Sequence, residues 1–193
     1  MLFRSSGKTV VADYGIDATL ADGRRAFYTT PVKALSNQKY RDLVARLGTH
    51  RVGLLTGDNS INGDADVVVM TTEVLRNMIY AEGRGLRDLG LVVLDEVHFL
   101  QDAYRGPVWE EVIIHLPPTV QLVCLSATVS NATELADWIS TVRGPTEPVV
   151  EDRRPVQLDH LFLVGDATHD RVHLMPTLLH GRPNPDEIGR AHV

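Results

Sequence analysis

Residues 91–98 read LVVLDEVH, and they constrain the fold of this chain more than any other stretch. Four apolar residues, two of them β-branched valines, predict a short strand that is buried on both faces, as in a parallel sheet covered by helices. Two carboxylates, Asp95 and Glu96, follow directly. Carboxylates at the end of a buried strand are costly unless a cation lies beside them. The stretch therefore predicts a parallel α/β sheet with a magnesium site at the end of one strand.

Strand-like and helix-like segments alternate along most of the chain. Such alternation predicts βαβ units with right-handed crossovers, and hence a three-layer α/β/α domain with a mostly parallel sheet. We expect helices at 7–20, 32–47, 72–81, 108–116 and 133–142. We expect strands at 26–30, 52–56, 67–71, 91–95 and 121–126, with two further candidates at 149–151 and 158–164.

Small polar or acidic residues follow each of the five predicted strands. Ligands of open parallel sheets gather outside the carboxyl ends of the strands, so these residues are expected to meet at one edge and to form the binding site. The five groups are Thr30 and Pro31; Thr56, Gly57 and Asp58; Thr71, Thr72 and Glu73; Asp95 and Glu96; and Ser126, Ala127 and Thr128.

The segment Gly7, Lys8 and Thr9 matches the second half of a phosphate-binding loop, G-x-x-x-x-G-K-[ST]. In such a loop the backbone N–H groups and the following helix N-terminus hold the phosphates. Lys8 would reach the β- and γ-phosphates, and the Thr9 hydroxyl would bind Mg²⁺. Leu2 stands where the pattern has its first glycine, so a plain helix N-terminus with a solvated lysine remains the alternative.

The acidic pair after the strand at 91–95 suits hydrolysis of a nucleotide. Asp95 would hold Mg²⁺, and Glu96 would orient and deprotonate the attacking water as a general base. His98 lies two positions further and is expected to hydrogen-bond toward the turn at 126–128. That contact would couple the nucleotide site to the next strand.

With these residues in place, the chain resembles superfamily-two helicases of the DEVH-box type. Ser126, Ala127 and Thr128 form the motif that follows the next strand in that group. The chain is most similar to the Ski-like (superkiller, exosome-associated) RNA helicases, and the variant resembles an actinobacterial one. The stretches that carry this resemblance are TPVKALSNQKYR at 30–41, VGLLTGD at 52–58, MTTEVLR at 70–76 and RGPVWEE at 105–111.

The resemblance implies a RecA-like P-loop domain that uses ATP and Mg²⁺ to move on and unwind RNA. Such a domain contacts the sugar-phosphate backbone and reads no bases, which suits a motor that accepts any sequence. Lys39 and Arg41 would add local positive charge. By position, the residues that would contact the sugar-phosphate backbone are Pro31, Lys33, Asn37, Gln38, Gly57, Asp58, Thr71, Thr72 and Glu73.

The sequence leaves two alternatives open. One is a DNA-repair helicase of the related superfamily-two group, which the run at 34–39 argues against. The other is a catalytically inert module that binds nucleotide or nucleic acid, which is what the chain by itself is expected to be. The partners implied for the intact protein are single-stranded or duplex RNA, an RNA-decay complex and a second RecA-like domain in the same chain.

Composition limits the remaining classes of function. The net charge of −6 argues against a bulk electrostatic grip on nucleic acid. The lone cysteine, Cys124, cannot form an internal disulfide and is expected to be a core residue in a reducing, cytoplasmic compartment. The apolar runs are strand-sized, so no membrane association is expected. His169 and His173 are four residues apart, but they lack a third ligand nearby.

The domain boundaries follow from where the motifs stop. We expect residues 6–150 to form a first RecA-like ATP-binding domain that is truncated at its N-terminus. Residues 151–187 would begin the connection toward a second such domain. Residues 1–5 and 188–193 match no element of the family and are expected to be a non-native leader and tail.

Overall fold

The computed structural model describes residues 7–81, 84–126, 132–151, 161–166, 171–179 and 182–184. The chain forms two compact units, Met1–Val150 and Glu151–Val193. The first unit contains a large sheet with its helices, and the second contains two short antiparallel strand pairs.

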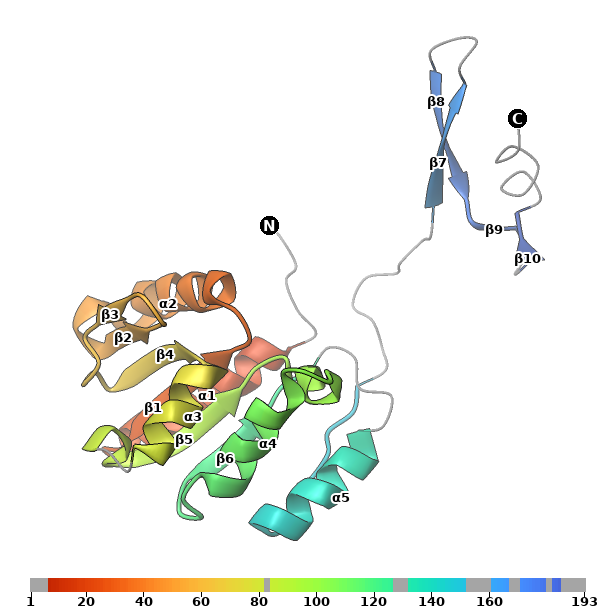
Figure 1. Ribbon diagram of the computed structural model, residues 1–193. Helices are drawn as coiled ribbons and strands as arrows, with labels where there is room; N and C mark the ends of the chain where they lie inside the picture. The colour runs from red at the N-terminus through yellow and green to blue at the C-terminus, as the bar shows by residue number, and fades with distance from the viewer. Residues whose placement is uncertain are drawn as a thin grey trace. The chain divides into compact units, whose positions relative to one another are not determined.

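The first unit is built on a six-stranded sheet with the order β3-β2-β4-β1-β5-β6 (Figure 1). All neighbours are parallel except β3, which pairs antiparallel with β2 at the edge. This confirms the predicted mostly parallel sheet. The strands are β1 (Arg25–Thr30), β2 (Val52–Leu55), β3 (Ser60–Ile61), β4 (Val67–Thr71), β5 (Leu89–Leu94) and β6 (Gln121–Cys124).

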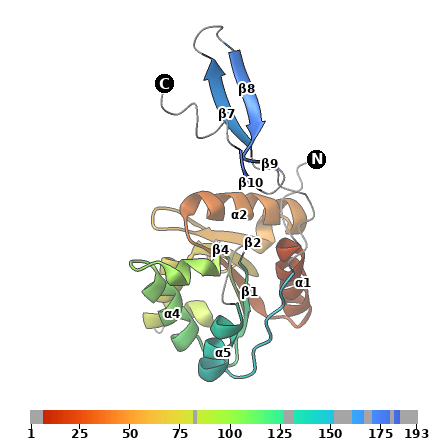
Figure 2. The same ribbon diagram turned by 90° about the vertical axis from the view of Figure 1, so that its right-hand side faces the viewer.

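Helices cover both faces of this sheet (Figures 1 and 2). The α-helices are α1 (Lys8–Ala21), α2 (Lys33–Leu47), α3 (Thr72–Tyr80), α4 (Gly106–His115) and α5 (Ala132–Arg143). Three short 3₁₀ helices connect elements: η1 (Thr49–Arg51), η2 (Arg84–Leu86) and η3 (Val97–Gln101).

Alternate residues of β1 enter two separate cores because strand side chains point to opposite faces. Phe27 packs with Trp109 and Ile139 in the core under α3, α4 and α5. Its neighbour Tyr28 packs with Ile16 and Leu43 in the core under α1 and α2. The predicted three-layer α/β/α arrangement is therefore confirmed.

Strand β5, which carries the LVVL run, is buried along its whole length. None of its apolar side chains is more than 3% exposed. It lies between β1 and β6, with a helical layer on each face. Burying one Val or Leu side chain contributes roughly 1.5–3 kcal/mol, so this strand is a major part of the core.

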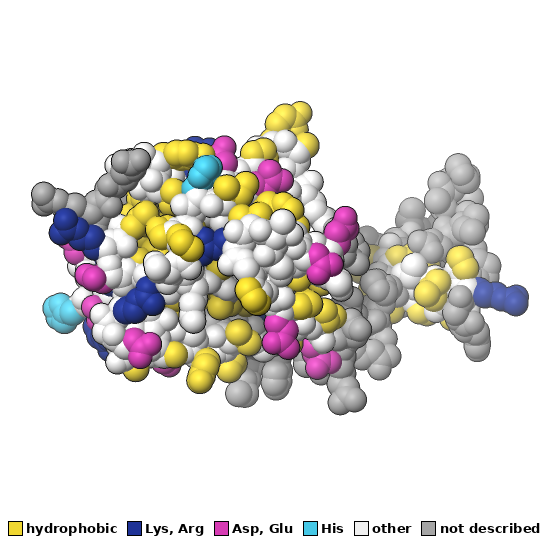
Figure 3. All heavy atoms as spheres, turned by 90° about the horizontal axis from the view of Figure 1, so that it is seen from below, with side chains coloured by type: hydrophobic (Ala, Val, Ile, Leu, Met, Phe, Trp, Pro, Cys, Tyr) yellow, Lys and Arg dark blue, Asp and Glu magenta, His cyan; other side chains and the backbone are white. Residues whose placement is uncertain are grey.

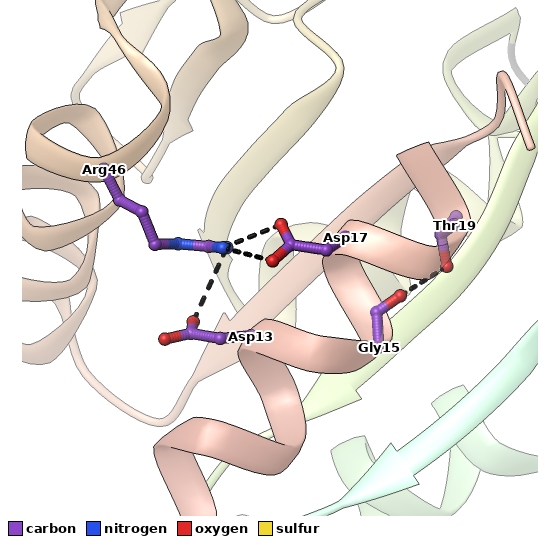
Figure 4. Close-up of polar contacts among 5 residues, drawn as sticks. All are labelled: Asp13, Gly15, Asp17, Thr19 and Arg46. Carbon is purple, nitrogen blue, oxygen red and sulfur yellow. Dashed lines mark hydrogen bonds and ion pairs between the residues drawn. The ribbon is translucent and has the colours of Figure 1, made fainter. Parts of the chain in front are cut away.

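A salt-bridge cluster joins α1 to α2 on the surface of the same layer (Figure 4). The Arg46 guanidinium lies 2.7 Å and 2.8 Å from the two carboxylate oxygens of Asp17. Its second terminal nitrogen lies 3.7 Å from Oδ1 of Asp13. The cluster is partly exposed, so its two-oxygen geometry fixes the relative position of the helices more than it adds stability.

The second unit contains an antiparallel hairpin of β7 (Leu161–Asp166) and β8 (Arg171–Pro176), and the short pair β9 (Leu178–Leu179) and β10 (Arg182–Pro183). The candidate strand at 158–164 thus has a counterpart in β7 from residue 161 onward. The candidate at 149–151 is not a strand: Val149 is 92% exposed and Val150 is 61% exposed. These residues favour strands, but no strand in the described part of the chain pairs with them.

Replacing Gly53 by alanine should destabilise the first unit. A Cβ at this position of β2 would overlap the backbone carbonyl oxygen of Asn62, which belongs to the chain that returns from β3. We expect a loss of about 1–3 kcal/mol in the free energy of unfolding, because backbone must shift to make room. Urea denaturation followed by circular dichroism measures it. In Gly57→Ala the new Cβ meets nothing within 4 Å, so equal stability losses in the two variants would contradict this assignment.

Cys124 should be chemically inert in the folded chain. It lies on β6 beside the core under α4 and α5, and burial raises the pKa of its thiol to about 12, although the nearby Arg143 charge opposes this. Thiolate is the reactive form, so the raised pKa leaves very little reactive thiol at pH 8. We expect iodoacetamide to label the native chain very slowly at pH 8 and the urea-unfolded chain readily. Equally fast labelling of both states would contradict this prediction.

Candidate active site

The ends of the parallel strands meet at one edge of the sheet, as the sequence predicted. The register pairs Thr29 with Leu94 and Thr30 with Thr71, and it pairs Leu94 with Cys124 on the other side. The residues that follow β1, β4, β5 and β6 are therefore level with one another.

The start of α1 lies at this same edge. Residues 22–24 form a tight turn between α1 and β1, so the helix and the strand run in opposite directions. The 14 residues of α1 span about 21 Å and the six residues of β1 about 20 Å, so their far ends are level. Because α1 packs over β1 and β5, Gly7 and Lys8 come to the carboxyl end of β5.

Gly7 gives this helix start an open shape. Its φ of +82° is in the left-handed region, and a Cβ there would meet nothing within 4 Å. No side chain among the described residues caps α1, and although the Val10 N–H donates to the Gly7 carbonyl at 3.0 Å, the N–H groups of Lys8 and Thr9 are available to an anion. Lys8 is half-buried and Thr9 is exposed.

Both carboxylate oxygens of Asp95 accept a hydrogen bond. Oδ1 accepts from the backbone N–H of Glu96 at 2.9 Å, and Oδ2 accepts from the Tyr28 hydroxyl at 2.7 Å. The Asp95 N–H itself donates to the carbonyl of Thr29 at 3.0 Å. Burial and the Asp95 charge raise the pKa of Tyr28 well above its usual range, so its hydroxyl stays a donor.

Glu96 turns the chain out of the strand. Its φ of 54° and ψ of 44° are left-handed, a conformation that costs a non-glycine residue energy and is concentrated at functional sites. Its Oε2 is buried without a hydrogen-bond partner among the described residues. The Nδ1 atom of the His98 ring lies 3.3 Å from this oxygen. Because no hydrogen bond among the described residues occupies it, the oxygen is available to a ligand.

His98 lies between the acidic pair and the end of β6. Its Nδ1 is 3.5 Å from the Ser126 hydroxyl. The backbone also bridges the two strand ends, since the Val97 N–H donates to the Leu125 carbonyl at 2.9 Å. Ala127 and Thr128, the other two residues expected to couple the site to this turn, lie outside the described residues.

The residues expected to contact nucleic acid differ widely in exposure. Lys33 and Asp58 are exposed and form an ion pair of 2.9 Å with each other. The hydrogen bond from Lys33 lowers the pKa of Asp58, and one from Thr56 lowers it further. Gly57 is also exposed, and Asn37, Gln38 and Glu73 are half-buried.

Three residues of that set have side chains enclosed by the protein: Pro31, Thr71 and Thr72. The Thr72 side chain is fully buried, and its hydroxyl donates to the carbonyl of Thr30 at 3.3 Å. That hydroxyl therefore links the start of α3 to the end of β1 instead of facing solvent. Any contact from Thr72 to a phosphate must therefore come from its backbone, at the start of α3.

Lys39 and Tyr28 form a contact that the sequence did not indicate. The Lys39 ammonium lies 4.6 Å from the centre of the Tyr28 ring. Lys39 is therefore directed onto the sheet, whereas Arg41 is exposed. No periodicity signal predicts such a pair, because it depends on how α2 lies over β1.

Surface charge agrees with the acidic composition. The face shown in Figure 3 carries Asp and Glu side chains scattered among Lys and Arg, without a continuous basic patch on its described part. Among the described residues there is no group of three or more His, Cys, Asp and Glu side chains that would enclose a metal ion. No helix in the described part of the chain is long and apolar enough to cross a membrane.

Comparison with known protein sequences places this chain in one family. The sequence model of the DEAD/DEAH box helicase family matches residues 4–135. The chain is 61% identical to "Probable helicase HelY" of Mycobacterium leprae over 165 residues, covering 86% of this chain and 18% of that protein. It is 55% identical to "DExH-box ATP-dependent RNA helicase DExH15 chloroplastic" of Arabidopsis thaliana, covering 82% and 14%.

A third relative carries the name of the group that the motifs resemble. The chain is 48% identical to "Superkiller complex protein 2" of Mus musculus over 164 residues, covering 84% of this chain and 13% of that protein. The chain thus spans less than a fifth of the length of these relatives. The resemblance to the Ski-like group is confirmed, and the chain belongs to the DEAD/DEAH box helicase family.

Proposed function

We propose that the first unit binds ATP with Mg²⁺ and hydrolyses it as part of an RNA helicase. The observation that carries this proposal is the site at the end of β5, where Asp95 is held by two donors and the buried Oε2 of Glu96 makes no hydrogen bond among the described residues. The DExH15 relative is named as an ATP-dependent RNA helicase, which supports RNA as the nucleic acid.

The residues present fit a magnesium–nucleotide complex. Gly7 leaves space at a helix start that no described side chain caps, where phosphates bind favourably. Thr9 and Asp95 would hold the ion through oxygen atoms, which Mg²⁺ prefers. Mg²⁺ is usually bound by one or two carboxylates together with substrate phosphates, so a complete protein cage is not needed.

The chain's own groups would divide the chemistry among them. Bound Mg²⁺ would neutralise charge on the phosphates. Lys8 would bind the β- and γ-phosphates, and Glu96 would orient the attacking water and accept its proton. His98, within reach of both Glu96 and Ser126, would transmit the state of this site to the turn after β6. Ser126, Ala127 and Thr128 would couple hydrolysis to strand separation.

Nucleic acid would lie along the carboxyl ends of the strands and along α2, and the protein would contact its sugar-phosphate backbone. Lys33, Asn37, Gln38, Gly57 and Glu73 are at least partly exposed there. The enclosed residues Pro31, Thr71 and Thr72 would shape the loops that carry these contacts. Asp58 would compete with phosphate for the Lys33 ammonium. Such contacts give affinity without sequence readout.

Two further proposals concern the setting. A second RecA-like domain in the same protein would complete the ATP site, as the Ski-like resemblance implies. The name of the superkiller relative supports a role with an RNA-decay complex, and we propose a cytoplasmic location for this work.

Lys8→Ala should weaken binding of a non-hydrolysable ATP analogue in the presence of Mg²⁺ by about tenfold or more. The reason is that a hydrogen bond to a charged group contributes roughly 1.5–3 kcal/mol. NMR titration of the amide resonances measures the affinity even when it is weak. Arg87→Ala, which removes one charge from the exposed turn before β5, should leave it unchanged.

Glu96→Gln provides a second comparison for the same site. It keeps the shape of the side chain but removes the base, so analogue binding should persist while any RNA-stimulated hydrolysis disappears. For the first variant, if Lys8→Ala binds the analogue as tightly as the unaltered chain does, Lys8 is not a phosphate ligand.

Lys33→Met should weaken binding of single-stranded RNA, and Asp58→Asn should strengthen it. The two side chains are paired at 2.9 Å, so removing the carboxylate charge frees the ammonium for a phosphate. Fluorescence anisotropy at several salt concentrations tests this, and loss of one contact should reduce the salt slope by about 0.7.

Arg51→Met is the matched control for charge. Arg51 is paired with Asp66 at 2.7 Å. It directly precedes β2, so it lies at the amino ends of the parallel strands, away from the proposed site at their carboxyl ends. Its loss should leave RNA affinity nearly unchanged. If Arg51→Met and Lys33→Met weaken binding equally, the proposed RNA position is incorrect. A DNA strand of the same sequence tests the substrate preference in parallel.

A further inference from the structure

One buried polar group at the site is assigned no role by the proposed mechanism: the hydroxyl of Tyr28. Tyr28 lies on β1 in the middle of the sheet and is 1% exposed. Its hydroxyl donates to Oδ2 of Asp95 at 2.7 Å. The two residues are 67 positions apart, so the parallel pairing of β1 with β5 brings them together.

The geometry of Asp95 shows what this bond does. The second carboxylate oxygen, Oδ1, accepts from the Glu96 N–H at 2.9 Å. One donor comes from the backbone of the next residue and the other from a neighbouring strand, so together they fix the rotation of the carboxylate. Each oxygen keeps lone-pair capacity for a further partner. Without the tyrosine, only the local backbone donor would orient the group.

The tyrosine ring is itself held in place from two sides. It packs in the core formed with Ile16 and Leu43, and the Lys39 ammonium of α2 lies 4.6 Å from its centre. The preceding side chain on β1, Phe27, is buried in the core on the opposite face of the sheet and needs no polar partner. A buried hydroxyl must find a hydrogen-bond acceptor, and here the acceptor is the carboxylate assigned to Mg²⁺.

We propose that Tyr28 is a positioning residue for the magnesium–nucleotide complex, which acts by orienting the Asp95 carboxylate. The inference rests on the proposed function, since it assigns Asp95 to the metal. Groups that hydrogen-bond to metal-binding side chains orient those side chains, and their removal typically weakens metal binding by about 10–100-fold. Tyr28 therefore matters for the ion and not for nucleotide contacts made by Gly7 and Lys8.

Tyr28→Phe in the full 193-residue chain tests this inference. The chain is saturated with a non-hydrolysable ATP analogue and titrated with Mg²⁺, and NMR follows the Glu96 amide, which contacts Asp95 directly. We expect the half-saturating Mg²⁺ concentration to rise about tenfold or more. Analogue affinity measured in EDTA should stay unchanged, a separation that a merely structural loss would not produce.

Tyr40→Phe is the matched control. Tyr40 packs against the same core cluster from α2, so this variant removes a tyrosine hydroxyl without touching Asp95. It should titrate like the unaltered chain. Thermal denaturation of both variants shows whether each is folded at the titration temperature, and Asp95→Asn should abolish the Mg²⁺ dependence that Tyr28→Phe weakens.

The possible failures are distinguishable. If the unaltered chain binds the analogue with Mg²⁺ and Tyr28→Phe titrates identically, the positioning role is overturned and the proposed function stands. If Tyr28→Phe weakens binding equally in EDTA and in Mg²⁺, the role is again overturned, because the effect is then not on the ion. If the unaltered chain shows no Mg²⁺-dependent binding, both the proposed function and this inference are overturned.

Discussion

The cost of placing Asp95 and Glu96 at the end of a fully buried strand governs the rest of this structure. Strand β5 is enclosed by neighbouring strands and by helices on both faces, so its end cannot move to relieve electrostatic strain. The carboxylates must instead be satisfied where they are. Tyr28 and the Glu96 N–H satisfy Asp95, whereas Glu96 keeps a buried oxygen without a donor among the described residues. The protein therefore fixes the orientation of Asp95, whose oxygens keep lone pairs for a ligand, and leaves Glu96 less constrained.

One layer of helices connects the two proposed ligand sites. Helix α1 begins at the phosphate side and α2 carries Lys33, and the two are joined by Arg46 with Asp17 and Asp13. Below them, Lys39 of α2 contacts the same tyrosine that holds Asp95. Displacement of α2 would therefore act on both a surface salt bridge and a buried hydrogen bond near the acidic pair. In the opposite layer an ion pair of 3.8 Å between Arg76 and Glu111 joins α3 to α4.

Sequence patterns predicted the elements whose signal is local. The valine-rich run predicted β5, and strand ends were predicted to meet because parallel topology requires it. The two-residue β3 was missed, since two residues carry no periodicity. The 149–151 segment was overestimated because apolar residues alone do not show whether a partner strand exists. The Tyr28–Asp95 bond was also missed: it joins residues on different strands, and only the register of β1 against β5 brings them together.

The same limitation applies to the proposed nucleic-acid surface, where sequence position did not predict exposure. Thr72 lies in a motif expected to contact phosphate, yet its hydroxyl is bonded to Thr30 inside the protein. Lys33 is exposed, yet its charge is already matched by Asp58. With a net charge of −6, the chain offers little long-range attraction to a polyanion. If this surface binds RNA as proposed, affinity would depend on exchanging surface ion pairs for phosphate contacts at short range, and the Lys33–Asp58 pair would set how tightly the strand is held.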